Sequence, residues 1–322
     1  MAATFAATNA VVKGTSPTGV DYFIPELWSD EVLAAHKANL VMQQLVKVMP
    51  FSGQKGDTVR VPLPVRGSAT AKQAANAVTL ITASDTKFDL TVNDHYEYSR
   101  LIEDIVAVQA NDSLRQFYSD DAGYALAVQE DTALHSEGAK FAAPDSTPTT
   151  AGSNYSKAVI GGDGSTVWSQ ASSGNGTALT DAGIRRAIQA LDDNNVPDRM
   201  RCLVIPPIEK RKLLGISRFT EQAFTGEAGG GNSIRNGLIG DVYGIPVYVS
   251  TNCATVEAND STAYRACLLF QKDAVVIAEQ MGPRTQTQKK LEFLADLFVA
   301  DVLYGVGTPR PENGVALIVP NS

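Results

Sequence analysis

The sequence predicts a protein of the α+β class that is built around one long helix. Three observations carry this prediction. Residues 101–138 repeat their apolar positions with a helical period, residues 51–99 alternate apolar and polar side chains as strands do, and the chain after residue 180 places short apolar strands between helices. Together these patterns indicate a helical rod with strands packed on its flanks.

Composition excludes several classes of protein. With 322 residues, 44% hydrophobic and 19% charged, the chain is long enough for two folded units with their own cores. No apolar run reaches the roughly 18 residues that a membrane span needs, and residues 1–10 lack the order of a secretory signal. We therefore expect no membrane contact and a protein that stays in the cytoplasm where it is made.

The net charge and the cysteines argue against nucleic-acid binding, disulfides and a zinc site. The net charge of −8 argues against nucleic-acid binding by counterion release, so any contact with DNA would follow from confinement. The cysteines are odd in number and lack the C-x-x-C spacing, which favours buried thiols over disulfides or a zinc site: Cys202, Cys253 and Cys267.

The N-terminal part of the chain is expected to form an arm and a helix. Residues 1–21 are rich in Ala, Thr, Gly and Ser and offer few anchors. Residues 25–47 predict a helix, because Pro25 suits a first helical position and Pro50 a stop.

Residues 51–99 predict a long two-stranded arm. Val59 and Val61 alternate with Arg60 and Pro62 in the first strand, and the second strand presents an apolar row: Phe88, Leu90 and Val92. Proline lacks an N–H, so the first strand can be paired on one side at most. An isolated hairpin is marginal in water. The arm therefore needs a surface to lie on, and a neighbouring copy of the protein could supply it.

Residues 101–138 are expected to form a short helix and then a long one. Asn111 and Asp112 are suitable caps for the long helix, and Gly138 suits its end. Its apolar positions spread over roughly 200° of the circumference, so we expect it to be covered from two sides. The remaining face is acidic and should be solvated, with these members: Asp120, Glu130, Asp131 and Glu137.

The second half of the chain reads as an insertion followed by an α/β module. Residues 154–177 predict a surface insertion with at most a short hairpin turned at residues 161–164. Thr180 can cap a helix that ends near Pro197, and a buried strand, a second helix and further strands follow. The glycine-rich loop over residues 225–237 is expected to be mobile. The approximate divisions are residues 1–50, 51–99, 100–179, 180–270 and 271–322.

Catalytic and metal-binding patterns were sought, and the residues favour none. The histidines lie on separate elements without ligand spacing and are expected to be exposed or hydrogen-bonded: His36, His95 and His135. The carboxylate pairs at 103–104 and 130–131 are adjacent and do not face each other on a helix. We therefore predict no catalytic residues, no cofactor and no metal. A soluble α/β enzyme remains a remote alternative.

Three stretches resemble one known family. The family's spine helix is resembled by residues 97–138. Its axial domain is resembled by residues 179–214 and 237–250. Its closing strands are resembled by residues 269–281 and 299–319. The matching positions include Pro206, Leu213, Leu214, Gly240, Gly244, Ile245, Pro246, Val247, Tyr304, Gly305, Arg310 and Pro311. The family is that of the major capsid proteins of tailed bacteriophages, with the Hong Kong 97-type fold. The resemblance implies an N-terminal arm, an extended loop over residues 51–99, a spine helix, a peripheral domain and an axial domain.

The resemblance also implies a function and partners. It implies a structural protein that self-assembles into hexamers and pentamers of an icosahedral shell around packaged double-stranded DNA, and a virion location. No long helical segment precedes Ile24, so we expect a separate scaffolding protein, besides a portal protein and an optional decoration or cement protein. Lys72 and Asn313 are only loose candidates for the crosslink found in some members, so a non-covalent shell is expected. An encapsulin-like nanocompartment shell is the alternative.

Subunit contacts are expected at the extended loop and the spine helix. Arg60 and Arg66 lie opposite the apolar row of Phe88, Leu90 and Val92, and by resemblance they would meet an adjacent subunit's acidic surface: Asp120, Asp131 and Glu137. The same resemblance places a loop near the capsomer axis, with Gly226, Gly229, Gly230 and Gly231. It also places the insertion on the outer face, where deleting residues 161–172 is expected to leave assembly intact.

Overall fold

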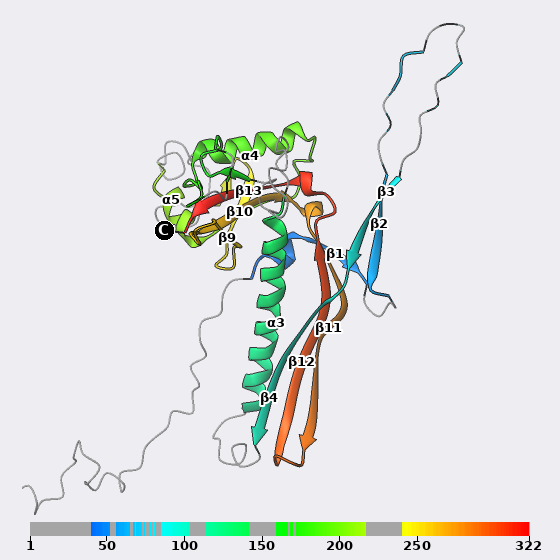
Figure 1. Cartoon of the computed structure of the whole chain (residues 1–322), viewed down its shortest axis with the longest axis vertical. Helices are drawn as coiled ribbons and strands as arrows, with labels where there is room; N and C mark the ends of the chain where they lie inside the picture. Colours follow the sequence, from blue (N-terminus) through cyan, green and yellow to red (C-terminus); the bar gives the residue numbers. More distant parts are fainter. Residues whose placement is uncertain are drawn as a thin grey trace, which may run out of the picture.

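A computed structural model describes residues 40–51, 56–64, 85–103, 114–141, 159–166, 172–216 and 240–321, with isolated residues in 67–80 and 168–169. In these ranges the chain forms a four-stranded sheet, a seven-stranded sheet and a two-stranded hairpin. The long helix α3 (Leu114–Gly138) runs beside the long strands of the four-stranded sheet towards the seven-stranded sheet (Figure 1). The predicted long helix is confirmed within a residue at each end.

The four-stranded sheet has the order β1-β11-β12-β4. Its strands are β1 (Lys47–Pro50), β4 (Asp94–Glu103), β11 (Val276–Lys290) and β12 (Ala295–Gly307). Alternate residues of β12 join the core that also contains residues of α3, as the two-residue period requires: Phe298, Ala300, Val302 and Tyr304.

Two sequence predictions fail in this sheet. Residues 101–103 belong to β4 and are not helical, because Leu101 pairs with Leu297 of β12. The helix predicted over residues 25–47 ends early in its described part. Only α1 (Met42–Leu45) is helical, and Lys47 starts a strand parallel to β11. Pairing with distant strands overrides local helical propensity in both places.

The seven-stranded sheet has the order β5-β13-β10-β6-β8-β7, with β9 also paired to β10. Its strands are β5 (Val159–Gly161), β6 (Arg201–Ile205), β7 (Asp241–Val242), β8 (Ile245–Val249), β9 (Thr255–Glu257), β10 (Ala263–Gln271) and β13 (Gly314–Pro320). Helices α4 (Asp181–Asp193) and α5 (Pro207–Leu213) accompany it, and two short 3-10 turns follow at Lys272–Ala274 and Pro311–Asn313.

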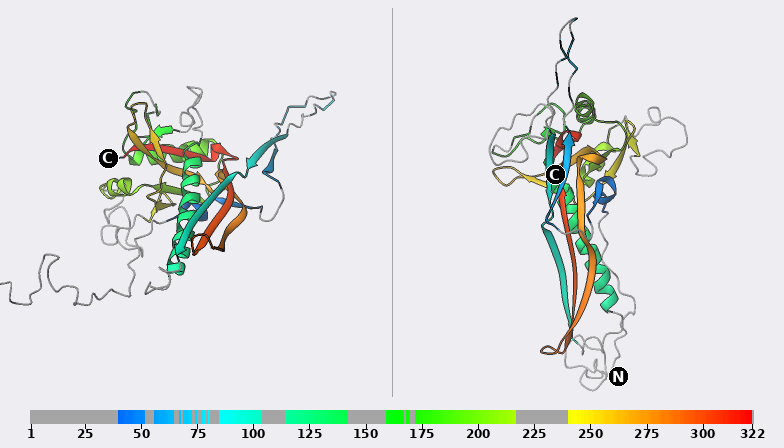
Figure 2. Two further views of the ribbon diagram at one scale, coloured as in Figure 1. Left: turned by 60° about the horizontal axis from the view of Figure 1, so that its bottom comes forward. Right: turned by 90° about the vertical axis from the view of Figure 1, so that its right-hand side faces the viewer.

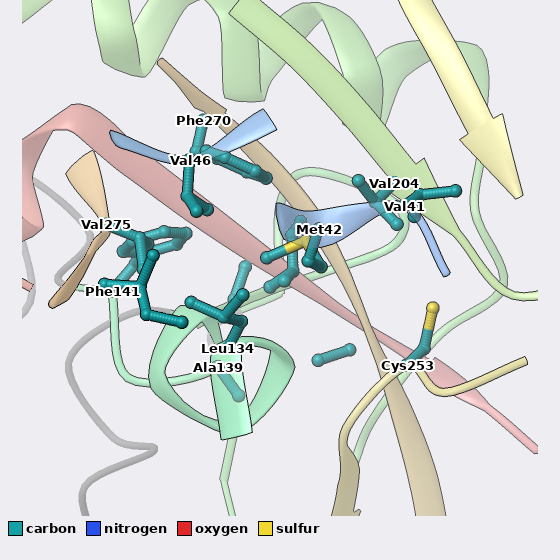
Figure 3. Packing of buried hydrophobic residues seen from close by; sticks show 14 of the residues in the cluster. Val41, Met42, Val46, Leu134, Ala139, Phe141, Val204, Cys253, Phe270 and Val275 are labelled. Carbon is teal, nitrogen blue, oxygen red and sulfur yellow. The ribbon is translucent and has the colours of Figure 1, made fainter. Parts of the chain in front are cut away.

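The central strands of this sheet are buried on both faces. On β10, Leu268 belongs to the core shared with α3, whereas its neighbour Leu269 belongs to the core under α4 and α5. Strands covered on both sides are apolar throughout, which explains the uninterrupted apolar run in β10. Figure 3 shows how the first core gathers Met42 of α1, Leu134 of α3 and Phe270 of β10.

The predicted helix and strands of the α/β module are confirmed. The Thr180 hydroxyl accepts a hydrogen bond from the Gly183 N–H at 3.2 Å and caps α4. The predicted division at residue 271 does not match the sheets, because β13 pairs with β10 in the seven-stranded sheet and not with β11 or β12. The three cysteines are free and buried, as expected.

The predicted surface insertion is corrected by the structure. Strand β5 adds to the edge of the seven-stranded sheet beside β13. The Trp168 ring is buried against Tyr264 of β10, with ring centroids 4.7 Å apart. Gly162 and Gly183 approach so closely that a Cβ on Gly183 would lie 2.0 Å from the Gly162 carbonyl oxygen. This part of residues 154–177 is therefore integral to the fold, and deletion of residues 161–172 is expected to unfold the subunit.

A single substitution tests this correction. Trp168→Ala removes a buried ring, and truncating a buried Trp typically costs about 3–5 kcal/mol of unfolding free energy. Thermal unfolding of the full chain should show a clearly lower midpoint for Trp168→Ala, with no such change for Ser173→Ala at an exposed position of the same segment. Equal midpoints for the two variants would restore the view of this segment as a dispensable insertion.

Candidate subunit-contact surfaces

The arm is a separate two-stranded hairpin of β2 (Thr58–Pro64) and β3 (Asp85–Thr91). In Figure 1 it lies to one side of the two larger sheets and extends away from them. As predicted, β2 pairs with only one strand in the part of the chain that the structure describes, β3, and it contains two prolines, Pro62 and Pro64.

The apolar row of the arm does not face a neighbour over its whole length. Leu90 and Val92 are only 2% and 5% exposed, and they pack with Phe51, Val276 and Ala278 of the same chain. The expectation that Leu90 and Val92 contact another subunit is therefore wrong. Phe88, two residues before Leu90 and therefore on the same face of β3, is half-buried against the same cluster. The part of the arm that packs on Phe51, Val276 and Ala278 is its base, and only the part beyond this base needs the surface of a neighbouring subunit.

Close backbone contact fixes the base of the arm. Strand β3 crosses β12 where Gly305 and Gly307 leave room. A Cβ on Gly305 would lie 2.4 Å from the Thr91 carbonyl oxygen. The Val92 N–H donates to the Asp57 carbonyl at 2.8 Å, and the Gln280 side chain donates to the Gly56 carbonyl at 2.9 Å. The arm thus leaves the protein in a defined direction.

The arginine face of the arm is solvated in the single chain. The Arg60 side chain is 74% exposed, with its Nε 3.7 Å from Asp89, whose carboxylate also binds the Lys87 ammonium at 2.8 Å. Two cations beside one carboxylate leave this face positive. Arg66 lies outside the described residues.

The predicted acidic face of the helix is largely used within the chain. Asp120 is exposed, as expected for a contact residue. Glu130 and Asp131 are buried, so Asp131 cannot reach another subunit and this expectation is wrong. Glu137 is half-buried and binds the Lys140 ammonium. The charge pattern indicated a solvated face because sequence alone does not show that α1 and the 250–253 loop cover this part of the helix.

A further exposed surface was missed by the sequence analysis. At the turn between β11 and β12, Leu291, Phe293 and Leu294 are 77%, 61% and 66% exposed. This turn, called the tip turn below (residues 291–294), lies at the far end of the long strands from the seven-stranded sheet (Figure 1). The sequence could have indicated this surface, because three large apolar residues fall within four positions directly after a polar strand.

Other predicted residues have structural positions or lie outside the described part. Asn313 is buried, which places its amide away from any crosslink.

His95 lies 3.2 Å from Asp301, and the Arg284 guanidinium binds the same carboxylate and holds the pKa of Asp301 below its ordinary value. His135 is buried, with no hydrogen-bond partner for either ring nitrogen among the described residues, contrary to expectation. The glycines of the predicted capsomer-axis loop lie outside the described residues.

Two features of other functional classes are absent from the described residues. No group of three or more His, Cys, Asp or Glu side chains there is arranged to hold a metal ion. No helix in those ranges has the length and apolar character to cross a membrane.

Comparisons with known proteins agree on one class. A family model described as phage capsid protein matches residues 40–301. A structure from Mycobacterium phage Che8 is 24% identical, with 92% of this chain and 97% of that chain covered and a TM-score of 0.70. The capsid of cyanophage P-SCSP1u is 20% identical, with coverage of 99% and 100% and a TM-score of 0.73.

The head structure of Helicobacter pylori bacteriophage KHP40 gives a similar result at 12% identity, with coverage of 95% and 99% and a TM-score of 0.68. No curated protein sequence matches the chain. The predicted fold, a mixed helix and sheet architecture of the phage capsid type, is confirmed.

Proposed function

The chain belongs to the phage capsid protein family, and on this basis we propose that it is the major subunit of an icosahedral shell that encloses packaged double-stranded DNA. The family match over residues 40–301 carries this proposal. It argues against both the encapsulin-like compartment and the soluble enzyme. The role is mechanical: the protein holds itself to copies of itself.

The shape of the subunit suits this role. The arm and the tip turn extend from different ends of the protein, away from its two large cores (Figures 1 and 2). Contacts at such distant points allow one subunit to reach several neighbours without rearranging its cores. We assign the arm beyond Phe88, Asp120 and the tip turn to contacts between subunits, and the loop with Gly226, Gly229, Gly230 and Gly231 to the capsomer axis.

The remaining partners follow from the same role. A separate scaffolding protein would guide assembly, a portal protein would occupy one vertex, and a decoration protein could bind outside. Packaged DNA would be held by confinement, because a chain with a net charge of −8 gains little from phosphate neutralisation. Synthesis in the cytoplasm of a bacterial host and a shell without covalent crosslinks complete the proposal.

Electron microscopy and sedimentation of the purified full chain test the function. Closed shells or capsomers, formed alone or with the phage's own scaffolding protein, are the expected result. A small monodisperse species in all of these conditions would contradict the proposal. Copurification of a peroxidase or a ferritin-like protein inside shells would instead favour the compartment.

Arg60 provides a test of the arm's charged face. Arg60→Ala should lower shell yield modestly while the isolated subunit stays folded, since an exposed ion pair is worth about 0.2–1 kcal/mol but recurs at every interface. High salt should reproduce part of the loss. Arg199→Ala is the control, because Arg199 is also exposed but lies in the turn before β6, outside the arm. Unchanged yield and melting temperature for Arg60→Ala would remove Arg60 from the interface.

A further inference from the structure

A single buried carboxylate on α3 is bonded to two distant segments of the chain. Asp131 is only 2% exposed, although ionisable side chains are seldom buried so fully unless they are paired. Its Oδ1 accepts the backbone N–H of Met42 at 3.0 Å, and its Oδ2 accepts the side-chain amide of Asn252 at 2.9 Å. These partners lie 89 and 121 residues away along the chain.

The two partners of Asp131 belong to different sheets. Met42 begins α1, which leads into β1 at the edge of the four-stranded sheet. Asn252 lies in the 250–253 loop after β8. In this loop the Ser250 N–H donates to the Ile205 carbonyl of β6 in the seven-stranded sheet at 3.0 Å. Asp131, Met42 and Asn252, called the joint below, therefore connect the two large sheets through α3.

The neighbouring histidine does not duplicate the bond from Asn252. His135 is fully buried one turn after Asp131, and its Nε2 lies 3.6 Å from the Asp131 Oδ2, beyond hydrogen-bond distance. Within the described residues, the hydrogen bond to Oδ2 therefore comes from Asn252.

Apolar packing surrounds the joint but has a different effect. Met42, Leu134 and Cys253 converge on one core from α1, α3 and the 250–253 loop (Figure 3). Apolar burial is non-directional. Hydrogen bonds require near-linear geometry, and those to a charged acceptor are short and strong. The core keeps the sheets together, whereas the bonds of Asp131 specify how they are oriented.

We propose that Asp131 is a positioning residue for assembly, which fixes the angle between the four-stranded and seven-stranded sheets and thereby the curvature of the shell. This inference rests on the proposed function. The arm base and the tip turn belong to the four-stranded sheet, while the loop assigned to the capsomer axis connects α5 to β7 of the seven-stranded sheet. A change in the angle therefore shifts contact regions that must engage neighbours at the same time.

The length of α3 amplifies a change at the joint. At a rise of about 1.5 Å per residue, the start of α3 lies about 26 Å from Asp131. A rotation of about 10° at the joint would move the start of α3 by about 4–5 Å, which is enough to separate apolar atoms in contact at about 4.5 Å. The start of α3 and the tip turn lie at the same end of the long strands (Figure 1). A small loss of order at Asp131 thus becomes a large displacement at this end.

Exchanging the carboxylate and the amide tests the joint in the full unassembled chain. Asn252→Asp alone places a second carboxylate against Asp131. At pH 8, where two carboxylates are least able to share a proton, it should raise the hydrogen-exchange rate of a peptide containing Met42 by about tenfold or more. Asn252→Asp combined with Asp131→Asn restores a donor and an acceptor across the contact and keeps an acceptor for Met42. The protection should therefore return in the double variant.

Electron microscopy of the shells tests the role in assembly. Shells of Asn252→Asp should vary in diameter or stay open, whereas the unaltered chain and the double variant should give one diameter. Asn252→Ala removes the donor without adding a charge. It should show the same defects to a smaller degree, so the test remains decisive if Asn252→Asp does not fold.

Thr251→Asp is the matched control, because it adds the same charge at the exposed neighbouring position of the loop. It should change neither the exchange rate nor the shell diameter. Uniform shells from Asn252→Asp or Asn252→Ala chains that have lost the protection of Met42 would overturn the proposal. So would a double variant in which the protection does not return. Failure of the unaltered chain to form shells would count against the proposed function, whereas the exchange rates report on the joint itself.

Discussion

Gly305→Ala will loosen the base of the arm and lower shell yield sharply. A Cβ at this position would lie 2.4 Å from the Thr91 carbonyl oxygen and 2.9 Å from the Val92 Cα, and both are backbone atoms. Neither can move aside as a flexible side chain could, so β3 must shift away from β12. That shift separates Leu90 and Val92 from Val276 and Ala278. Overpacking of this kind costs about 1–3 kcal/mol of unfolding free energy.

Gly282→Ala is the control for this substitution. Gly282 lies on β11 of the same sheet, and a Cβ there would meet nothing within 4 Å. Melting temperature and shell yield, measured for both variants, should fall for Gly305→Ala and stay unchanged for Gly282→Ala. If the two variants behaved alike, the close contact between β3 and β12 would not be what sets the arm's direction.

Replacing the apolar side chains of the tip turn will prevent assembly without unfolding the subunit. Leu291 and Phe293 are 77% and 61% exposed, so Leu291→Ser with Phe293→Ser removes little packing from the isolated chain. In a shell, full burial of a large apolar side chain is worth about 1.5–3 kcal/mol. Both losses would recur in every subunit, and the expected result is a folded, soluble species that forms no shells.

Sedimentation and circular dichroism separate the two effects. Met200→Ser is the matched control, because Met200 is 70% exposed but lies in the turn before β6, far along the chain from the tip turn. It should assemble normally. Normal shells from the tip-turn variant would show that these side chains stay in solvent throughout assembly, and the contact would then have to be sought elsewhere.

The parts of the fold that the sequence predicted well are those whose signal is local. The period of α3 and the Thr180 cap depend on neighbouring residues, and the strands β6, β10 and β13 are marked by short apolar runs. The resemblance added the order of these blocks. The local patterns and the resemblance can both be read from the sequence without knowing which elements pack against each other.

The failures occur where a distant segment decides the structure. Residues 101–103 have a helical pattern but pair with β12, and Lys47 follows a helical pattern but pairs with Val276. Polar composition around residues 161–172 suggested a surface loop, although Trp168 anchors it to β10. For the contact residues, Asp131 looked solvent-facing and Leu90 looked available to a neighbouring copy, because their coverings, α1 and the β11–β12 sheet, come from elsewhere in the chain.

The position of β13 has a consequence for the order of events during synthesis. This strand sits between β5 and β10, and its residues supply both cores of the seven-stranded sheet. While residues 314–320 are still inside the ribosome, β10 lacks a partner along one edge and β5 has none. Because pairing across so many residues is slow, we expect the seven-stranded sheet to close late in folding. Both cores of the seven-stranded sheet therefore stay incomplete until residues 314–320 have been synthesised.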